Sequence, residues 1–318
     1  MLDEAHTSGL RLFSGFYEGE PDLVADLYGR TLLLTSYSDS PEVSSSLLSE
    51  AQEFYFSTLP WLDCIIQKQK TSNDQDWKRG KVTFGTSPAG EVLENGIRFA
   101  LDLRMNQDAS LYLDTRNLRT WLKENCRGQS VFNAFAYTGS LGVAALSGGA
   151  ERVVQVDLNA RFLDLARRSA MLNRLDLGRM KLRAADFFSE VGRFKQEDCL
   201  FDLALLDPPF FSVTQKGKVD LVAESARIIN KIRPLIKHEG RLISINNALF
   251  LSGKDYMDSL QALCQDGYME IETIIPIPQD FTGFAGTIVS KPPVDPTPFN
   301  HSTKIAILKV NRKDGRTI

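Results

Sequence analysis

The 318-residue sequence predicts an α/β protein in which a Rossmann-like, doubly wound parallel sheet of seven strands follows a small α+β domain. Two observations predict this fold class. From about residue 130, strand-like apolar segments alternate with helix-like segments, which is typical of a parallel sheet with helices on both faces. Before that point, strand-like segments follow one another around a single long helical segment. We expect the two domains at 1–110 and 111–318, a division that suits the chain length.

The first domain is expected to contain four strands and one helix. Its β-prone, apolar segments lie at 10–17, 31–37, 62–69 and 97–103. The helical segment extends to Leu59; Ser40 can cap its start, and Pro41 suits the first helical position. The polar stretch 71–80 is expected to be a loop.

The second domain repeats a strand, a turn and a helix. The predicted strands are Val131–Phe135, Arg152–Val156, Met180–Ala184, Asp202–Leu206, Arg241–Ile245, Ile271–Ile275 and Lys304–Val310. The predicted helices are Leu141–Ser147, Asn159–Leu172, Phe188–Phe194, Leu221–Ile236 and Lys254–Gln265. Ligands of such folds bind beyond the carboxyl ends of the strands, where the strand order reverses. The residues directly after the strands are therefore the candidates for a binding site.

Composition excludes several classes of protein. The cysteines Cys64, Cys126, Cys199 and Cys264 are scattered, without a CxxC pair or a nearby histidine, so we expect neither a metal site nor a disulfide framework. No apolar run reaches the roughly 20 residues that span a bilayer, and the N-terminus does not read as a secretory signal. We expect a cytoplasmic protein that does not bind membranes, as a monomer or a homodimer.

The net charge of −3 argues against a large nucleic-acid footprint, because phosphate neutralisation dominates such binding. A local basic cluster between Lys68 and Lys81, which includes Trp77, is the candidate for RNA contact. A solvated loop is the plainer interpretation of the same cluster.

A glycine-containing turn follows the first strand of the second domain. Gly139 and Gly142 permit a tight turn into the next helix and a close approach of a ligand to the backbone. Tyr137 stands where a GxGxxG motif would have its first glycine, which argues against NAD. The candidate cofactor-binding residues of this turn are Asn133, Phe135, Tyr137, Thr138 and Gly139.

Acidic residues follow the second and third strands. Asp157 lies eighteen residues after Gly139, a spacing that suits hydrogen bonds from ribose hydroxyls, and Leu158 is included beside it. Asp186 can accept from an adenine amino group while Phe187 covers the ring. The alternatives are helix caps for the two aspartates, although Asn159 could replace Asp157, and a core position for the aromatic ring.

The fourth strand leads into the most specific signal in the chain, Asp207-Pro208-Pro209-Phe210-Phe211. Two prolines remove two backbone donors and fix φ, so the loop is stiff and its carbonyls lack local partners. Such carbonyls can accept from a base N–H, and Phe210 can stack on a planar base. We expect Asp207, Pro208, Pro209 and Phe210 to be catalytic and Phe211 to contact the substrate.

These four elements, in this order, resemble the class I S-adenosylmethionine (SAM)-dependent methyltransferases. Three segments, Asn133–Gly139, Asp207–Phe211 and Tyr112–Arg116, are similar to the bacterial 23S rRNA large-subunit methyltransferase family, as is Gly15–Gly29 in the first domain. The resemblance covers nearly the whole chain. It implies a Rossmann-like fold, SAM as cofactor and rRNA as substrate. It also implies that Asp114 and Arg116 lie near the methionine end of SAM, where Arg116 could pair with the carboxylate.

That family includes a cytosine-C5 enzyme and a guanine-N7 enzyme. Methylation at cytosine C5 needs a thiolate that adds to C6, and no cysteine follows the fourth or fifth strand. A ring nitrogen already presents a lone pair and needs mainly alignment. The segments 244–247 and 279–281 resemble the guanine-N7 member, and Asn246 and Asn247 could bond a base edge, with a local turn as the equal alternative.

The expected function is SAM-dependent methyl transfer to a base nitrogen of RNA, with 23S rRNA guanine as the first choice. One alternative is a non-catalytic SAM-binding or RNA-binding accessory protein. Another is a methyltransferase with a substrate other than RNA. A nicotinamide-dependent oxidoreductase is disfavoured by the missing glycine at Tyr137.

Overall fold

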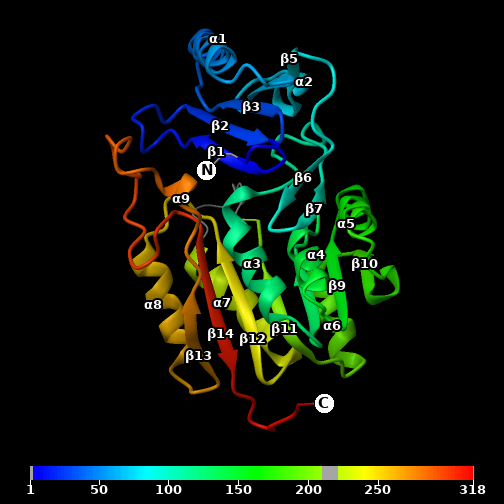
Figure 1. Cartoon of the computed structure of the whole chain (residues 1–318). Helices are drawn as coiled ribbons and strands as arrows, with labels where there is room; N and C mark the ends of the chain where they lie inside the picture. Colours follow the sequence, from blue (N-terminus) through cyan, green and yellow to red (C-terminus); the bar gives the residue numbers. More distant parts are fainter. Residues whose placement is uncertain (1–2, 210–220, 318) are drawn as a thin grey trace. The chain divides into compact units, whose positions relative to one another are not determined.

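The computed structural model describes residues 3–209 and 221–317 (Figure 1). The chain divides into two compact units. The first unit comprises Met1–Arg116 and Pro278–Pro292, and the second comprises Asn117–Ile277 and Pro293–Ile318. The sequence predicted a boundary near residue 110. In the structure, the first unit also includes the later segment Pro278–Pro292.

The first unit is built on a five-stranded sheet in the order β1-β2-β3-β4-β5. Its strands are β1 (Gly9–Phe13), β2 (Leu23–Tyr28), β3 (Thr31–Ser36), β4 (Cys64–Gln69) and β5 (Lys81–Phe84). The strands β3 and β4 are parallel and are connected by helix α1 (Pro41–Thr58), whereas the other neighbours are antiparallel. The side chain of Ser40 accepts from the Val43 N–H, as the sequence predicted for the start of α1.

Smaller elements complete the first unit. They are α2 (Gln75–Arg79), the hairpin of β6 (Glu91–Glu94) and β7 (Ile97–Ala100), the 3-10 turn η1 (Leu113–Thr115) and α9 (Gln279–Thr282). The expected loop at 71–80 therefore contains a short helix, whose N-cap Asp74 accepts from the Asp76 N–H. Strand β2 was not predicted, because its residues are all buried and lack the alternation of a half-exposed strand.

The second unit contains the predicted seven-stranded sheet, in the order β10-β9-β8-β11-β12-β14-β13. Its strands are β8 (Ser130–Ala134), β9 (Arg152–Asp157), β10 (Met180–Ala184), β11 (Phe201–Leu206), β12 (Ile236–Asn246), β13 (Met269–Ile274) and β14 (Lys304–Val310). All neighbours are parallel except those of β14, which is antiparallel to both β12 and β13. The predicted fold class is confirmed.

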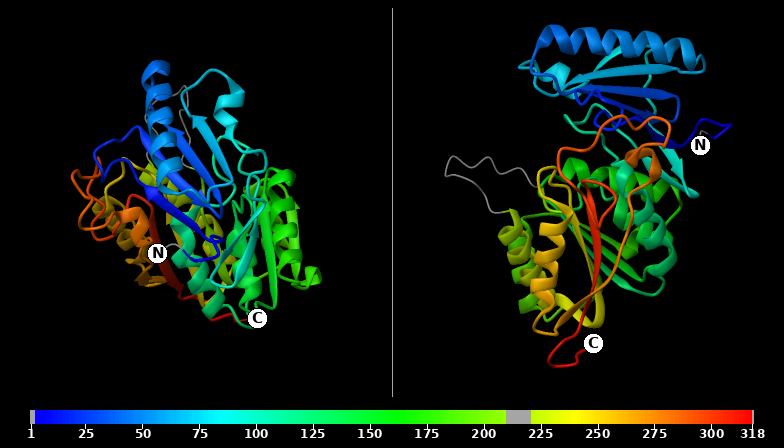
Figure 2. Two further views of the ribbon diagram at one scale, coloured as in Figure 1. Left: turned by 45° about the horizontal axis from the view of Figure 1, so that its top comes forward. Right: turned by 90° about the vertical axis from the view of Figure 1, so that its left-hand side faces the viewer.

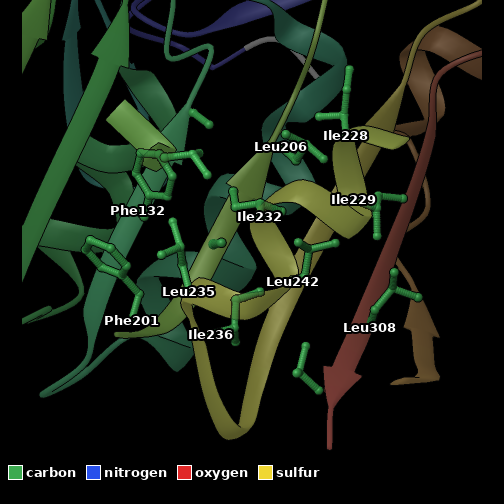
Figure 3. Packing of buried hydrophobic residues seen from close by; sticks show 14 of the residues in the cluster. Phe132, Phe201, Leu206, Ile228, Ile229, Ile232, Leu235, Ile236, Leu242 and Leu308 are labelled. Carbon is green, nitrogen blue, oxygen red and sulfur yellow. The ribbon is translucent and has the colours of Figure 1, made fainter. Parts of the chain in front are cut away.

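Helices cover both faces of this sheet (Figure 2). They are α3 (Arg116–Asn125), α4 (Ser140–Ser147), α5 (Ala160–Leu172), α6 (Phe187–Gln196), α7 (Leu221–Ile232) and α8 (Gly253–Cys264), with the 3-10 turns η2 (Leu177–Arg179) and η3 (Arg233–Leu235). Apolar residues of α6, α7 and α8 pack with those of the sheet in one core (Figure 3). Helix α7 ends four residues before the predicted Ile236 because Pro234 cannot continue the α-helical hydrogen bonds.

Among the described residues, no helix has both the length and the hydrophobicity to cross a bilayer. The described part of the chain also contains no cluster of three or more His, Cys, Asp or Glu side chains arranged to hold a metal ion.

Candidate active site

The parallel strands of the second unit end at one edge of the sheet, which we call the carboxyl edge. Ala134 of β8 is level with Val156 of β9 and with Leu206 of β11. Strand β8 lies between β9 and β11, so the strand order reverses beside it, which is where ligands of doubly wound sheets bind. Because adjacent strands are about 4.8 Å apart, Asp157 and Asp207 emerge at this edge on the order of 10 Å from each other.

The turn from β8 to α4 has an unusual backbone. Phe135, Tyr137 and Gly139 have φ values of +56°, +50° and +73°. These values lie in the left-handed region, which residues other than glycine rarely adopt. Two hydrogen bonds connect the turn to β9, from the Ala136 N–H to the Val156 carbonyl (2.8 Å) and from the Tyr137 N–H to Asp157 Oδ2 (2.8 Å). Strained backbone of this kind clusters at ligand sites, so the turn is a candidate binding loop.

The two glycines of the turn make room for a buried side chain. A Cβ on Gly142 would lie 2.4 Å from Oε1 of Gln155, and a Cβ on Gly139 would lie 2.7 Å from the same atom. Gln155 is fully buried in β9. The sequence analysis assigned these glycines to close approach of a ligand; the structure gives them a packing role against Gln155.

Asn133 carries an acceptor without a partner. Its Nδ2 donates to Gln155 Oε1 (2.9 Å), while its Oδ1 is buried and has no hydrogen-bond partner among the described residues. Leaving a buried polar atom unpaired is costly, so such an atom needs an explanation. An ammonium or amide N–H of a ligand at the carboxyl edge would provide a donor for this oxygen.

Asp157 organises the carboxyl edge. Its Oδ2 accepts from the Tyr137 N–H and its Oδ1 from the Asn159 N–H (2.9 Å), and burial raises the pKa of the carboxyl group. Asn159, not Asp157, is the N-cap of α5, so the alternative role considered for Asp157 is not the one observed. Leu158 beside it is 76% exposed, an apolar surface next to a carboxylate that can accept further hydrogen bonds.

Asp186 and Phe187 have the structural roles that were the alternatives to cofactor binding. Asp186 is the N-cap of α6 and accepts from the Ser189 N–H at 3.0 Å. Phe187 is 3% exposed and stacks on Phe135 with ring centroids 4.7 Å apart. The second carboxylate oxygen of Asp186 lies at an exposed position, so its contact with an adenine amino group stays a prediction.

The Asp207-Pro208-Pro209 loop follows β11 at the carboxyl edge, next to β8. Asp207 is half-buried, Pro208 is buried and Pro209 is exposed. Phe210 and Phe211, predicted to contact the substrate, lie outside the described residues. The structure therefore places three of the five predicted residues of this motif beside the β8 turn.

At the end of β12, Asn246 serves the fold. It is fully buried, and its Oδ1 accepts from the Ala248 N–H at 3.0 Å, which is the local turn considered as the alternative to base binding. Its Nδ2 has no partner among the described residues. Asn247 is exposed. Of the two predicted base-binding asparagines, Asn247 alone presents its side chain to solvent.

Lys304, which the sequence analysis did not single out, lies opposite Asn246 in the pairing of β12 and β14. It is fully buried, and its Nζ donates to the carbonyls of Ala248 (3.1 Å) and Ser302. Burial lowers its pKa to about 8. The sequence signal for this role was a lysine directly before the apolar run Ile305–Leu308.

Asp114 and Arg116 belong to the first unit. The guanidinium of Arg116 bonds both carboxylate oxygens of Asp280 at 3.0 Å and the Gly9 carbonyl at 2.8 Å. Asp280 also accepts from the Arg11 N–H (2.9 Å). The structure thus gives Arg116 a buried protein partner, and its predicted pairing with the methionine carboxylate stays untested. The segment 279–281, compared above with the guanine-N7 enzyme, is part of this same ion-pair cluster.

Three lysines of the predicted basic cluster at Lys68–Lys81 already have partners within the first unit. Lys68 is 1% exposed, and its Nζ donates to the carbonyls of Asn106 and Asp108, both at 3.0 Å. Lys70 pairs with the Asp108 carboxylate. Lys81 pairs with Asp74 (3.2 Å) and lies over the Trp77 ring. The prediction of an RNA-binding patch here has no support in this geometry.

Residues 64–266 match the family described as S-adenosylmethionine-dependent methyltransferase. The chain is 31% identical over 210 residues to ribosomal RNA large subunit methyltransferase I of Aeromonas salmonicida, an alignment that covers 64% of this chain and 52% of the relative. The chain thus spans about half the length of this curated relative. A 29% identical match to the protein of the same name from Escherichia coli strain HS covers 73% of this chain and 59% of the relative.

Solved structures agree on the fold. A Streptococcus mutans structure described as a SAM-dependent methyltransferase superposes with a TM-score of 0.80 at 21% identity, covering 96% of this chain and 76% of that one. A structure described as a methyltransferase complexed with SAH gives 0.79 with the same coverage. The names of the relatives specify large-subunit ribosomal RNA and no base. The predicted guanine-N7 branch is therefore not supported by them.

Proposed function

The chain belongs to the S-adenosylmethionine-dependent methyltransferase family, and we propose that it methylates a base of large-subunit ribosomal RNA. One observation carries the proposal. The strained turn follows β8, Asp157 ends the neighbouring strand β9, and the Asp207-Pro208-Pro209 loop follows β11 on the other side. All three features lie at the carboxyl edge of one sheet within one unit. A cofactor side and an acceptor side thus meet where the strand order reverses.

The residues at this edge fit SAM, the cofactor that the family uses. The unpartnered Oδ1 of Asn133 is an acceptor for the amino group of the methionine moiety. The Asp157 carboxylate has acceptor capacity beyond its bonds to Tyr137 and Asn159, which suits ribose hydroxyls, and the exposed Leu158 side chain suits the adenine face. SAM supplies a methyl group activated by its attachment to a sulfonium.

The acceptor side is assigned to the loop after β11. Pro208 and Pro209 have fixed φ and no N–H, so the loop backbone presents carbonyls that need not move to receive a donor. Asp207 is half-buried at the head of this loop. We assign to these three residues the positioning of a planar base, a contribution of alignment, not of acid or base chemistry.

The proposed transfer needs no cysteine nucleophile. Cys126 precedes β8 and Cys199 precedes β11, while Cys264 ends α8, a helix that begins after the carboxyl end of β12. Cys64 is buried in β4 of the first unit. Burial raises the pKa of the Cys64, Cys126 and Cys264 thiols, to about 12 for Cys126, whereas a reactive cysteine needs a lowered pKa.

A variant with all four cysteines replaced by alanine should therefore keep its methyl-transfer rate, provided that circular dichroism shows it folded. The measurement is transfer of label from radioactive SAM to RNA, with the wild-type protein beside it. A covalent adduct between any of these cysteines and RNA, or loss of transfer in a folded single variant, would overturn this part of the proposal.

The main test uses RNA from a strain that lacks the gene. Purified protein and labelled SAM are incubated with this RNA, and mass spectrometry of the nucleosides identifies the methylated base and atom. We expect label in 23S rRNA, and in no RNA from a strain that carries the gene. Tight SAM binding without label in RNA would instead favour the accessory-protein alternative, and label in protein or small molecules would favour a different substrate.

A further inference from the structure

We propose that the solvent-exposed face of α5, together with the edge strand β10, binds the phosphate backbone of the RNA. This inference rests on the proposed function and adds to it the surface by which a chain of net negative charge holds a polyanion. We call this surface the α5–β10 face, and we define it by its exposed cations Arg161, Arg167, Arg168, Arg174, Arg179 and Lys181.

The charge of this surface is opposite to that of the whole chain. The protein has a net charge of −3, but residues 161–183 contain seven basic and two acidic residues. Arg168, Arg174 and Lys181 are exposed, and none of them makes an ion pair among the described residues. Local clusters of unpaired cations attract nucleic acid regardless of the net charge, because binding depends on the phosphates that they neutralise.

Helix stability does not account for all of these charges. The first turn of α5 has no acidic residue and contains Arg161, although a helix N-terminus favours negative charge. At the other end, the Arg174 N–H bonds the Met171 carbonyl and the Leu175 N–H bonds the Ala170 carbonyl, both at 3.0 Å. This is the Schellman arrangement, in which the residue at the Arg174 position is usually glycine.

Arg174 has a φ of +54°, so the chain keeps an arginine where the backbone favours glycine or asparagine. A strained residue that persists in a fold points to a role for its side chain. Arg174 also directly follows the C-terminus of α5, where a cation is favoured. The Arg174→Asn variant separates a role in RNA binding from a role at the helix terminus.

Apolar side chains lie among the cations. Met171, Leu172 and Leu177 are 61%, 39% and 41% exposed. Arginine combined with exposed apolar side chains suits a nucleotide chain, which offers phosphates alongside the flat faces of sugars and bases. Strand β10 is the edge of the seven-stranded sheet, and among the described residues it pairs with β9 and with no further strand (Figure 1).

The surface also leads to the candidate active site. Helix α5 begins at Ala160, directly after Asp157 and its N-cap Asn159, and β10 ends level with Asp157. An RNA chain lying along the α5–β10 face therefore reaches the carboxyl edge at which the methyl group is transferred under the proposed function.

The test is a triple variant, Arg168→Gln, Arg174→Asn and Lys181→Gln, in the full-length protein. The probe is deproteinised 23S rRNA from the deletion strain, with affinity measured by filter binding at several salt concentrations. We expect affinity to fall about tenfold or more, and the slope of log affinity against log salt to decrease by about 2 in magnitude. The KM for RNA should rise, while kcat and the SAM affinity stay unchanged.

A matched triple, Lys195→Gln, Lys254→Gln and Lys313→Gln, removes the same number of charges from exposed positions outside the α5–β10 face. It should change RNA affinity by less than about twofold. Equal losses in the two triples would mean that only net charge matters, and would overturn the proposal. If the wild type methylates RNA and the α5–β10 triple variant keeps its RNA affinity, the proposal is overturned and the proposed function stands. If the wild type does not methylate RNA, the proposed function itself is wrong.

Arg174→Asn alone keeps the proposal testable without loss of folding, because asparagine tolerates the left-handed backbone better than arginine. We expect thermal stability to stay equal or to rise while RNA affinity falls. Lower stability with unchanged RNA affinity would assign Arg174 to the helix terminus and count against the proposal.

Discussion

The ion pairs of the first unit and the carboxyl edge of the second unit differ in how their polar groups are partnered. In the first unit, Arg11 bonds both oxygens of Asp26, at 2.8 and 2.9 Å, and Arg116 bonds both oxygens of Asp280. At the carboxyl edge of the second unit, Asn133 Oδ1 and Asn246 Nδ2 are buried without a partner among the described residues. Charges that satisfy one another belong to the architecture, whereas hydrogen-bonding capacity left over at a strand end points to a ligand.

This contrast corrects the interpretation of individual residues. Arg116 and Lys68 were selected from the sequence for contact with SAM and RNA, and the structure gives both of them protein partners. Asp157 was selected on its spacing, and its carboxylate accepts from Tyr137 in the strained turn after β8, the strand that carries the unpaired Asn133 oxygen. Variants of residues from both kinds of environment test this distinction.

The largest effect is expected for Arg116→Ala. Its removal leaves Asp280, whose side chain is 8% exposed, without its guanidinium partner, which should lower the free energy of unfolding of the first unit by about 3 to 5 kcal/mol. The measurement is urea unfolding followed by Trp61 and Trp77 fluorescence in a Trp121→Phe background. Arg30→Ala is the control, because its ion pair with Asp63 is exposed and should contribute about 1 kcal/mol or less.

Similar losses in these two arginine variants would contradict the assignment of Arg116 to the architecture. Calorimetry with SAM on the folded Arg116→Ala protein tests the other prediction made from the sequence. A clear loss of SAM affinity there would support a contact between Arg116 and the methionine carboxylate.

An intermediate effect is expected for Lys304. Its pKa is about 8 in the folded protein and near 10.5 when unfolded, so the unfolded chain binds more protons between these values and stability rises with pH across that window. Replacing Lys304 by Met should remove about 2 kcal/mol of this rise between about pH 7.5 and 9.5. The measurement is urea unfolding at pH 7.5 and 9.5, followed by Trp121 with the other two tryptophans replaced by phenylalanine. The exposed Lys254→Met should leave the rise unchanged; a rise that persists in Lys304→Met would contradict the assignment.

The smallest effect is expected for Asp157→Asn. Loss of the charged acceptor should weaken SAM binding by about 1 to 3 kcal/mol in calorimetry. Because burial raises the pKa of Asp157, wild-type SAM affinity should also fall as the pH is lowered through that raised value, and the asparagine variant should lack this dependence. Asp164→Asn, an exposed position on α5, is the control. Unchanged affinity would remove Asp157 from the cofactor site.

Much of the fold was predictable because its signals are local. Strands Met180–Ala184 and Lys304–Val310 were predicted with their observed bounds, since each is a short β-prone segment between turn residues. Two of the missed elements lack local contrast. The fully buried β2 shows no alternation, and α2 is a polar segment whose cap at Asp74 was not recognised.

The sequence by itself determined the parallel sheet, the strand-end positions of Asp157 and Asp207, and the stiff Pro-Pro loop, because strand periodicity and proline geometry act over a few residues. Which polar groups already have protein partners depends on the packing of the whole chain. Arg116 and Asp280 are 164 residues apart in the chain, and Lys304 and Ala248 are 56 apart. Hydrogen bonds over such separations depend on how the chain packs, and no local pattern encodes them.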